Sequence, residues 1–189
     1  MPDKSSQAGS DNSLPAYAQV VIIGGGVIGC STAYHLSKLG WKDVILLEQN
    51  QLTAGTTWHA AGLVEAGGFF DNTTIGMAKY TLELYAELEK ETGQATGFNP
   101  VGMLEIACTQ SRLEGLRRIS AFCRNSGVNV EEISPGEVRK LWPLMDASDV
   151  LAGFITPGDG RANTVEVNMA LDKGARQRGV QIFEETTVI

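Results

Sequence analysis

A glycine cluster directly after a short apolar run is the feature that most constrains the fold of this chain. Residues 18–23 read AQVVII, a β-branched run typical of a parallel strand that is buried on both faces. The pattern G-x-G-x-x-G follows at once, with Gly24, Gly26 and Gly29 in the marked positions. The first glycine allows a tight turn, the second leaves room for a pyrophosphate, and the third lets the next helix pack against the strand. The sequence therefore predicts a dinucleotide at the amino end of a helix over residues 27–39.

The following segment completes this strand–turn–helix pattern. Residues 43–47 predict a second strand, and Glu48 follows it at about the distance expected of an acid that binds ribose hydroxyls. The negative charge of this side chain would repel a ribose phosphate, which disfavours NADP. The pattern does not separate FAD from NAD, so an NAD-dependent dehydrogenase stays an alternative at this point.

Charge and composition exclude several classes of partner. The formal net charge of −7 argues against nucleic acid, because phosphate binding needs a basic face. No apolar run approaches the roughly 20 residues that span a bilayer, so we expect no membrane partner. Cys30, Cys108 and Cys123 show neither metal nor disulfide spacing, and we predict no metal site.

The first 19 residues differ in composition from the rest of the chain. They are rich in Ser, Asp, Pro and Gln, which predicts a disordered leader over residues 1–19. This segment has no apolar core of the kind found in a secretory signal and no Arg of the kind found in a mitochondrial presequence. We therefore expect a cytoplasmic protein, most simply a bacterial one.

The segment after Glu48 carries the most specific pattern in the chain. Residues 51–64 read QLTAGTTWHAAGLV, and residues 53–63 match the pattern T-A-G-[ST]-T-W-H-[AT]-A-G-L without interruption. This pattern resembles the dimethylglycine dehydrogenase and sarcosine dehydrogenase family, in which its histidine is bonded covalently to FAD. A looser resemblance continues through residues 82–98 and 151–160. The resemblance implies FAD as the cofactor and His59 as its covalent attachment point.

The chemistry of these residues agrees with that role. A neutral imidazole beside the flavin's benzenoid methyl group can form a stable bond with it, and small residues at 60–62 would let the ring lie close to the backbone. The other histidine, His35, is expected to be structural. We predict these cofactor-binding residues: Gly24, Gly26, Val27, Ile28, Gly29, Glu48, Thr56, Thr57, His59, Gly62, Leu63 and Val188.

The resemblance also implies an activity, the oxidation of an N-methylated amino acid at its CH–NH bond by hydride transfer to flavin. Tetrahydrofolate would serve a region beyond these residues, and the electron acceptor, an electron-transfer flavoprotein or oxygen, stays open. No catalytic residue can be named. Arg161 is one candidate for the substrate carboxylate, against the alternative of a solvated loop arginine. A non-catalytic regulatory relative with the same fold is the alternative of a different class.

The expected fold class is α/β, a Rossmann-like FAD-binding domain with part of an α+β substrate domain inserted. We expect residues 20–70 to begin the FAD-binding domain, residues 71–160 to form the incomplete substrate-side part, and residues 161–189 to return to the first domain. We also expect the chain to be part of a longer enzyme and to be inactive alone. After residue 70 the sequence predicts helices at 71–93 and 164–178, and strands at 98–108, 150–155 and 180–183. Two further helices are predicted from capping boxes, one over residues 111–114 (SRLE) and one over residues 134–137 (SPGE).

Overall fold

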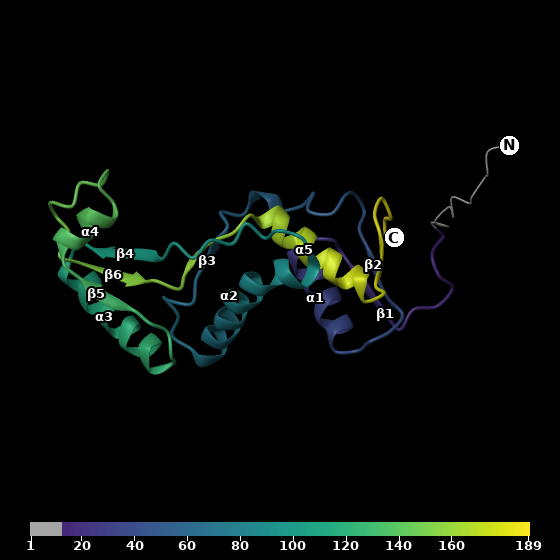
Figure 1. Ribbon diagram of the computed structural model, residues 1–189, viewed down its shortest axis with the longest axis horizontal. Helices are drawn as coiled ribbons and strands as arrows, with labels where there is room; N and C mark the ends of the chain where they lie inside the picture. Colours follow the sequence, from purple (N-terminus) through teal and green to yellow (C-terminus); the bar gives the residue numbers. More distant parts are fainter. Residues whose placement is uncertain (1–12) are drawn as a thin grey trace.

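The computed structural model describes residues 13–189, which form two lobes joined by a long helix (Figure 1). Most of the predicted leader, residues 1–12, lies outside the described residues. Residues 13–19 form no regular structure, and Gln19 then donates to the carbonyl of Asp43 at 2.8 Å. No helix in the described part of the chain is both long and apolar enough to cross a membrane.

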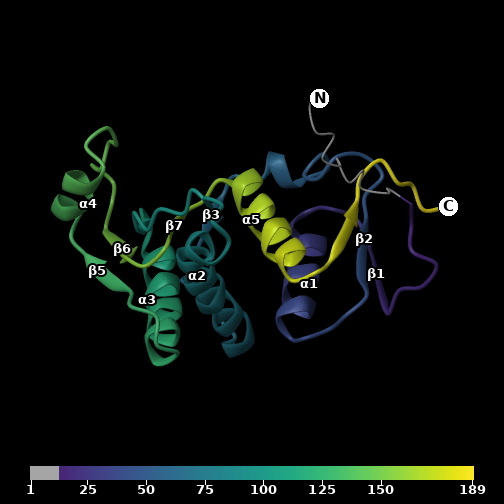
Figure 2. The same cartoon turned by 45° about the vertical axis from the view of Figure 1, so that its right-hand side comes forward.

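The first lobe, here called the parallel lobe, is a three-stranded parallel sheet with two helices. The strands β1 (Val20–Ile23), β2 (Val44–Leu47) and β8 (Gln181–Phe183) lie in the order β1-β2-β8. The helices α1 (Val27–Lys38) and α5 (Thr164–Gln177) lie side by side on one face of this sheet (Figure 2). The predicted Rossmann-like α/β fold and the predicted return of the chain to the parallel sheet are thus confirmed.

One expectation about this sheet is wrong. We predicted a first strand buried on both faces, but the side chains of Val21 and Ile23 are 51% and 69% exposed. Successive side chains of a strand point to opposite faces. Those of Val20 and Ile22 pack into the core under α1 and α5, whereas those of Val21 and Ile23 point away from it.

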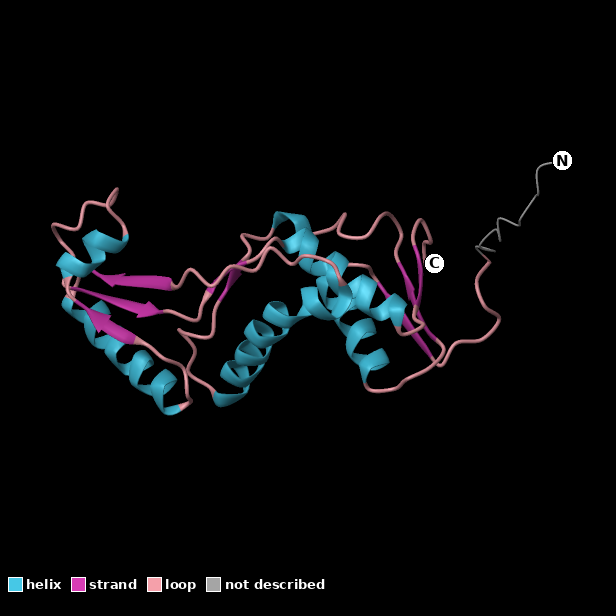
Figure 3. Cartoon of the chain, viewed as in Figure 1, coloured by secondary structure: helices cyan, strands magenta, loops and turns pink. Residues whose placement is uncertain are grey.

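The second lobe, here called the antiparallel lobe, is built on a different sheet. Its strands β4 (Met103–Ala107), β5 (Glu131–Ile133) and β6 (Ala152–Thr156) pair antiparallel in the order β4-β6-β5. Figure 3 shows this sheet with α3 (Gln110–Asn125) along it and the short α4 (Pro135–Leu141) at its end. The sequence predicted β4 and β6, with shifted bounds, but not β5.

In this lobe, α3 begins at a different residue from the one predicted. We predicted a capping box from Ser111 to Glu114, but the cap of α3 is Thr109, whose hydroxyl accepts from the amide of Arg112 at 3.2 Å. Thr109 has the extended backbone that a cap requires, so the helix begins before Ser111. The box at Ser134 is confirmed, because Ser134 and Glu137 accept from each other's backbone amides.

Helix α2 (Asn72–Thr92) connects the two lobes, and it contributes to both cores. Near its start Ile75 packs in the core of the antiparallel lobe, whereas Leu84 and Leu88 pack in the core of the parallel lobe. The helix ends at Gly93, whose φ of +69° is typical of a glycine cap. The domain boundaries proposed from the sequence remain a prediction.

A second, thinner connection runs beside this helix. The strands β3 (Leu63–Val64) and β7 (Gly160–Arg161) pair antiparallel between the lobes. Asn99 forms an isolated bridge with Arg161 on the other side, and Gly102 turns the chain at φ +84° before β4 begins. This bridge and turn shorten the strand that we predicted over residues 98–108.

Candidate functional site

The glycine turn between β1 and α1 has the geometry that its three glycines require. Gly24 has a φ of +105°, a conformation that side chains rarely adopt, and its amide donates to the carbonyl of Leu47 at 2.8 Å. A Cβ atom on Gly29 would lie 1.9 Å from the carbonyl oxygen of Gly24. Helix α1 therefore packs so tightly on the turn that only glycine fits at this position.

The amino terminus of α1 offers backbone N–H groups to a ligand. The amide of Val27 donates to the hydroxyl of Thr57 at 3.1 Å, and no side chain of the helix caps its own start. Among the described residues, no hydrogen bond is donated by the amides of Gly26, Ile28 or Gly29. Unpaired amides at the positive end of a helix dipole bind anions, phosphate above all.

Glu48 braces this turn from the end of β2. One carboxylate oxygen accepts from the amide of Gly25 at 2.6 Å, and the other accepts from the amide of Asn50 at 2.8 Å. An ionised carboxylate has about four acceptor sites, so each oxygen keeps capacity for another hydrogen bond. The predicted contact with ribose hydroxyls is therefore compatible with this bracing role and remains a prediction.

The tryptophan–histidine segment forms a single 3₁₀ turn, Thr57–His59, near the start of α1. Thr57 is buried by its contact with the helix, whereas Thr56 and His59 are exposed. The rings of Trp58 and His59 lie edge to face, 3.7 Å apart between centroids. The described residues include no hydrogen-bond partner for the His59 ring. The imidazole is therefore available for bonding outside the chain.

The residues after His59 show why glycine stands at position 62. Its φ is +76°, and a Cβ atom there would lie 2.4 Å from the carbonyl oxygen of Ala162. The carbonyl of Gly62 accepts from the amide of Ala162 at 2.8 Å. We expected small residues here to admit a flavin ring, and the structure shows that Gly62 admits a neighbouring strand. The side chain of Leu63, the next residue, is 64% exposed.

Leu63 lines two hollows. The smaller, of about 180 Å³, extends from the start of α1 to β3, and its lining includes Val27, Thr57 and Gly62. The larger, of about 620 Å³, continues along the antiparallel lobe. Arg161 is the only charged residue in the lining of the larger hollow, which is otherwise mostly apolar. The start of α1 and an apolar surface with one cation thus border two hollows that share the side chain of Leu63.

The last predicted cofactor residue lies elsewhere. Val188 is 48% exposed in the irregular segment after β8, and it lines neither of the two hollows. A separate hollow near the ends of β2 and β8 is lined by Asn50, Gln51 and Glu185 among others. The expected contact of Val188 with an adenine therefore remains a prediction.

Asp159 was not predicted from the sequence as a residue of the site. This carboxylate is 1% exposed and accepts from the amides of Ala66 at 2.8 Å and Gly67 at 3.3 Å. Burial raises the pKa of the Asp159 carboxyl, although the two backbone donors act in the opposite direction. These two hydrogen bonds hold the segment after β3 against the turn before β7. The surrounding sequence, Pro-Gly-Asp-Gly, indicates only a turn.

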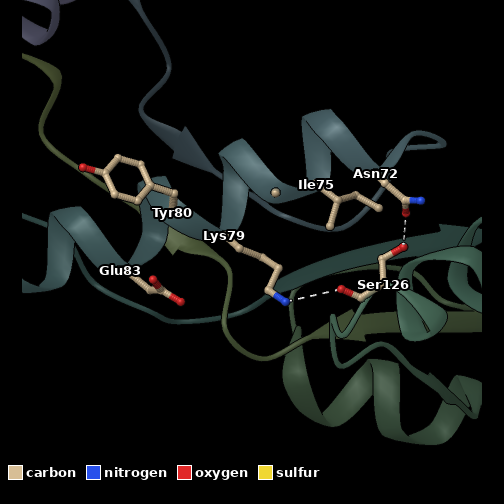
Figure 4. A pocket seen from close by; sticks show the side chains of 7 residues that line it. Asn72, Ile75, Lys79, Tyr80, Glu83 and Ser126 are labelled. Atoms are coloured by element: carbon tan, nitrogen blue, oxygen red, sulfur yellow. Dashed lines mark hydrogen bonds between the residues drawn. The ribbon is translucent and has the colours of Figure 1, made fainter. Parts of the chain in front are cut away.

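A further hollow of about 430 Å³ lies between α2 and the end of α3 (Figure 4). Lys79 donates to the carbonyl of Ser126 at 3.3 Å, and the Ser126 hydroxyl donates to the Asn72 side chain at 2.8 Å. These polar groups satisfy one another and join the two helices, so we assign no ligand to this hollow. Elsewhere in the described residues, no group of His, Cys, Asp and Glu side chains could hold a metal ion.

Comparison with known proteins identifies similar sequences and folds. Residues 19–189 match the family described as "DAO: FAD dependent oxidoreductase". The mitochondrial pyruvate dehydrogenase phosphatase regulatory subunit of Mus musculus is 43% identical over 93% of this chain. The mitochondrial dimethylglycine and sarcosine dehydrogenases of Homo sapiens are 41% and 38% identical over 86% and 95% of it.

These relatives are much longer than the chain. It spans 20%, 19% and 20% of their lengths, respectively. Among solved structures, L-proline dehydrogenase from P. horikoshii superposes with a TM-score of 0.87 at 28% identity, over 93% of this chain and 46% of that one. The sequence-based resemblance to the dimethylglycine and sarcosine dehydrogenases is confirmed.

Proposed function

Because the chain belongs to the family of FAD-dependent oxidoreductases, we propose that its full-length protein oxidises an N-methylated amino acid of the dimethylglycine or sarcosine type. The observation that carries this proposal is that Val27, at the uncapped start of α1, and Arg161 line two hollows that share Leu63, with the exposed His59 in the same short turn as Thr57 of the first hollow. The family assignment makes FAD the expected cofactor and weighs against the NAD-dependent alternative.

The residues present fit the pyrophosphate of FAD. The amides of Gly26, Ile28 and Gly29 supply donors, and the absence of a Cβ at Gly26 keeps the approach to them open. Glu48 has acceptor capacity for ribose hydroxyls at the neighbouring strand end. When bound, FAD would supply the hydride acceptor for the C–H bond next to the substrate nitrogen. The chain's own contribution is to bind and orient it.

His59 would hold the flavin end of the cofactor. The exposed imidazole lies in the same short turn as Thr57, which touches the start of α1. A bond from this ring to the flavin would fix the cofactor at both ends, at the pyrophosphate and at the ring. Tetrahydrofolate, if used, would bind outside the residues described, and the cytoplasmic location remains a prediction.

Arg161 would receive the substrate carboxylate. Its guanidinium is the one charge among the mostly apolar side chains that line the larger hollow, and β3–β7 pairing fixes its backbone beside Leu63. An apolar surface with a single cation suits a small N-methylated amino acid, which carries methyl groups and one carboxylate. This arrangement favours amino acids over simple amines.

The regulatory alternative has its own support, since the similar mouse protein is described as a regulatory subunit. Such a protein would keep the fold and lose turnover. The glycine turn and the exposed His59 favour a working flavin site, but they would also be compatible with a bound, inactive cofactor. Only a measurement of substrate turnover distinguishes the enzyme from the regulatory alternative.

The test is anaerobic addition of sarcosine or dimethylglycine to the purified full-length protein. The proposal predicts loss of the visible flavin absorbance with these compounds, and none with dimethylamine, which lacks the carboxylate. A yellow protein that no N-methylated amino acid bleaches would support the regulatory alternative. The variant Arg161→Ala should raise KM by about tenfold or more, since a charged hydrogen bond contributes about 1.5–3 kcal/mol, and Arg161→Lys should restore part of the loss.

A further inference from the structure

We infer that Asn168 is a positioning residue for the cofactor's pyrophosphate, holding the Gly25–Gly26 peptide so that the Gly26 amide points toward the anion. This inference rests on the proposed FAD site. Asn168 lies on α5, and its side chain is 0% exposed. Its Nδ2 atom donates to the carbonyl oxygen of Gly25 at 3.0 Å, across a separation of 143 residues.

The geometry of the peptide bond links this contact to the ligand. A trans peptide is planar, so its carbonyl and its N–H point in opposite directions. The carbonyl of Gly25 and the N–H of Gly26 belong to one peptide group. Because Asn168 draws that carbonyl toward the interior, the Gly26 amide faces the other way, and among the described residues no protein group accepts from it.

The same peptide is held from other directions as well. Glu48 accepts from the amide of Gly25 at 2.6 Å, and the amide of Thr53 donates to the Gly25 carbonyl at 3.3 Å. The Cys30 sulfur lies 3.6 Å from that carbonyl, and burial raises the pKa of its thiol to about 12, so it stays a neutral, weak donor. Asn168 supplies the only fully buried side-chain amide in this set.

The other half of the Asn168 amide argues against a packing role. Its Oδ1 atom is the one buried side-chain oxygen or nitrogen in the described residues without a hydrogen-bond partner. An unpartnered buried oxygen destabilises a fold, and leucine of similar size would avoid that cost. The donor to Gly25 is therefore what asparagine contributes at this position.

The experiment compares the binding of ADP, which carries a pyrophosphate, with that of adenosine, which carries none. Flavin-free full-length protein is prepared in a His59→Ala background, and its dissociation constants for ADP and adenosine are measured by calorimetry. We expect Asn168→Leu to weaken ADP binding by about tenfold, the effect of one hydrogen bond of ordinary strength. Adenosine binding should change less than about twofold, because it makes no use of the Gly26 amide.

Two further variants keep the result interpretable. Leu171→Ala, a buried residue of the same helix, should lower the melting temperature and leave the ratio of the two constants unchanged. Asn168→Met has a flexible apolar side chain and no donor, so it should reproduce the loss for ADP if the leucine variant does not fold. An unchanged ratio in a folded Asn168 variant would overturn the inference. Failure of the background protein to bind ADP at all would instead refute the dinucleotide site itself.

Discussion

Helix α1 of the parallel lobe begins differently from the helices of the antiparallel lobe. In the antiparallel lobe, α3 and α4 start at Thr109 and Ser134, whose hydroxyls accept from amides of the first turn. In the parallel lobe, α1 starts at Gly26, which has no side chain to offer. A hydroxyl cap satisfies one of the free amides of the first turn from the cap residue itself, whereas a glycine start leaves all of them for groups outside the helix. At α1 the Thr57 hydroxyl takes one of these amides, and we propose that FAD takes others.

Helix α5 shows that this difference is not a property of a whole lobe. It lies in the parallel lobe, yet Asn163 caps it by accepting from the amides of Val165 and Glu166. The uncapped start is thus confined to the glycine turn. Variants at capped and uncapped helix starts test this distinction.

The largest effect is expected from Gly29→Ala. The new Cβ would lie 1.9 Å from the Gly24 carbonyl, so the turn must move, at a cost of about 1–3 kcal/mol or more. We predict that the full-length variant purifies with little or no FAD, as read from its flavin absorbance per protein. The matched control is Gly115→Ala in α3, where a Cβ meets nothing within 4 Å. That variant should keep its flavin and gain about 0.5–1 kcal/mol of stability.

Gly26→Ser tests the uncapped start directly. Serine would give α1 the hydroxyl cap that α3 and α4 have, and its Cβ would lie 3.3 Å from the Thr57 hydroxyl oxygen. We predict that FAD affinity falls by about tenfold or more, because the hydroxyl competes with the phosphate for the same amides. Titration of the flavin-free protein with FAD measures this. Unchanged affinity would mean that these amides do not bind the pyrophosphate.

Thr109→Ala removes a cap from the antiparallel lobe. Loss of such a cap typically costs about 1 kcal/mol of unfolding free energy, which denaturant titration can detect. Because α3 packs in the core of the antiparallel lobe and not against the glycine turn, we expect FAD affinity to stay at its original value. A parallel loss of FAD binding would show that the lobes are coupled more strongly than this comparison assumes.

The smallest expected effect is the loss of unfolding free energy when the ion pairs of Glu91 in α2 are removed. Burial raises the pKa of Glu91, but hydrogen bonds from Tyr34 and Arg178 and the charge of Lys38 outweigh it, and the net pKa is lowered. A lowered pKa contributes stability above the unfolded value, near 4.3 for Glu, and that stability is lost as pH falls through the folded value. Glu91→Gln should therefore cost up to about 1 kcal/mol at pH 7.

The pH dependence distinguishes this effect from lost packing. The difference between wild type and Glu91→Gln should shrink once pH falls below the unfolded value, near 4.3, and should vanish as pH passes the lowered pKa of the folded carboxyl, where the wild-type side chain is protonated too. Glu87→Gln is the control on the same helix, since the pair of Glu87 with Lys90 is 63% and 75% exposed and screened by solvent. A difference that stays constant with pH would exclude the ion-pair explanation.

The comparison also explains which features could be predicted from the sequence. The glycine turn, α1 and β2 follow one another along the chain, so a local pattern identifies them. The start of α3 was placed wrongly, because both Thr109 and Ser111 are good caps and only the backbone conformation decides between them. Strand β5 was missed because its residues, EEI, have no apolar alternation and pair with a strand some 20 residues later.

The same limit applies within the candidate site. Glu48, Thr57 and His59 could be proposed from the sequence because they lie in a continuous segment close to the glycines. Asp159 and Asn168 were not found, because their partners lie 93 and 143 residues away. Buried polar side chains whose only partners are distant backbone atoms leave no periodic or spacing signal in a single sequence.

We propose that FAD binds at the glycine turn and that its ring is bonded to His59. Acid precipitation of the full-length protein tests this bond. We predict that the flavin stays with the protein pellet and that a tryptic peptide containing His59 carries the mass of the flavin. His59→Ala should release the flavin into the supernatant, and the control His35→Ala should not. Complete release of flavin from the wild-type protein would contradict the account.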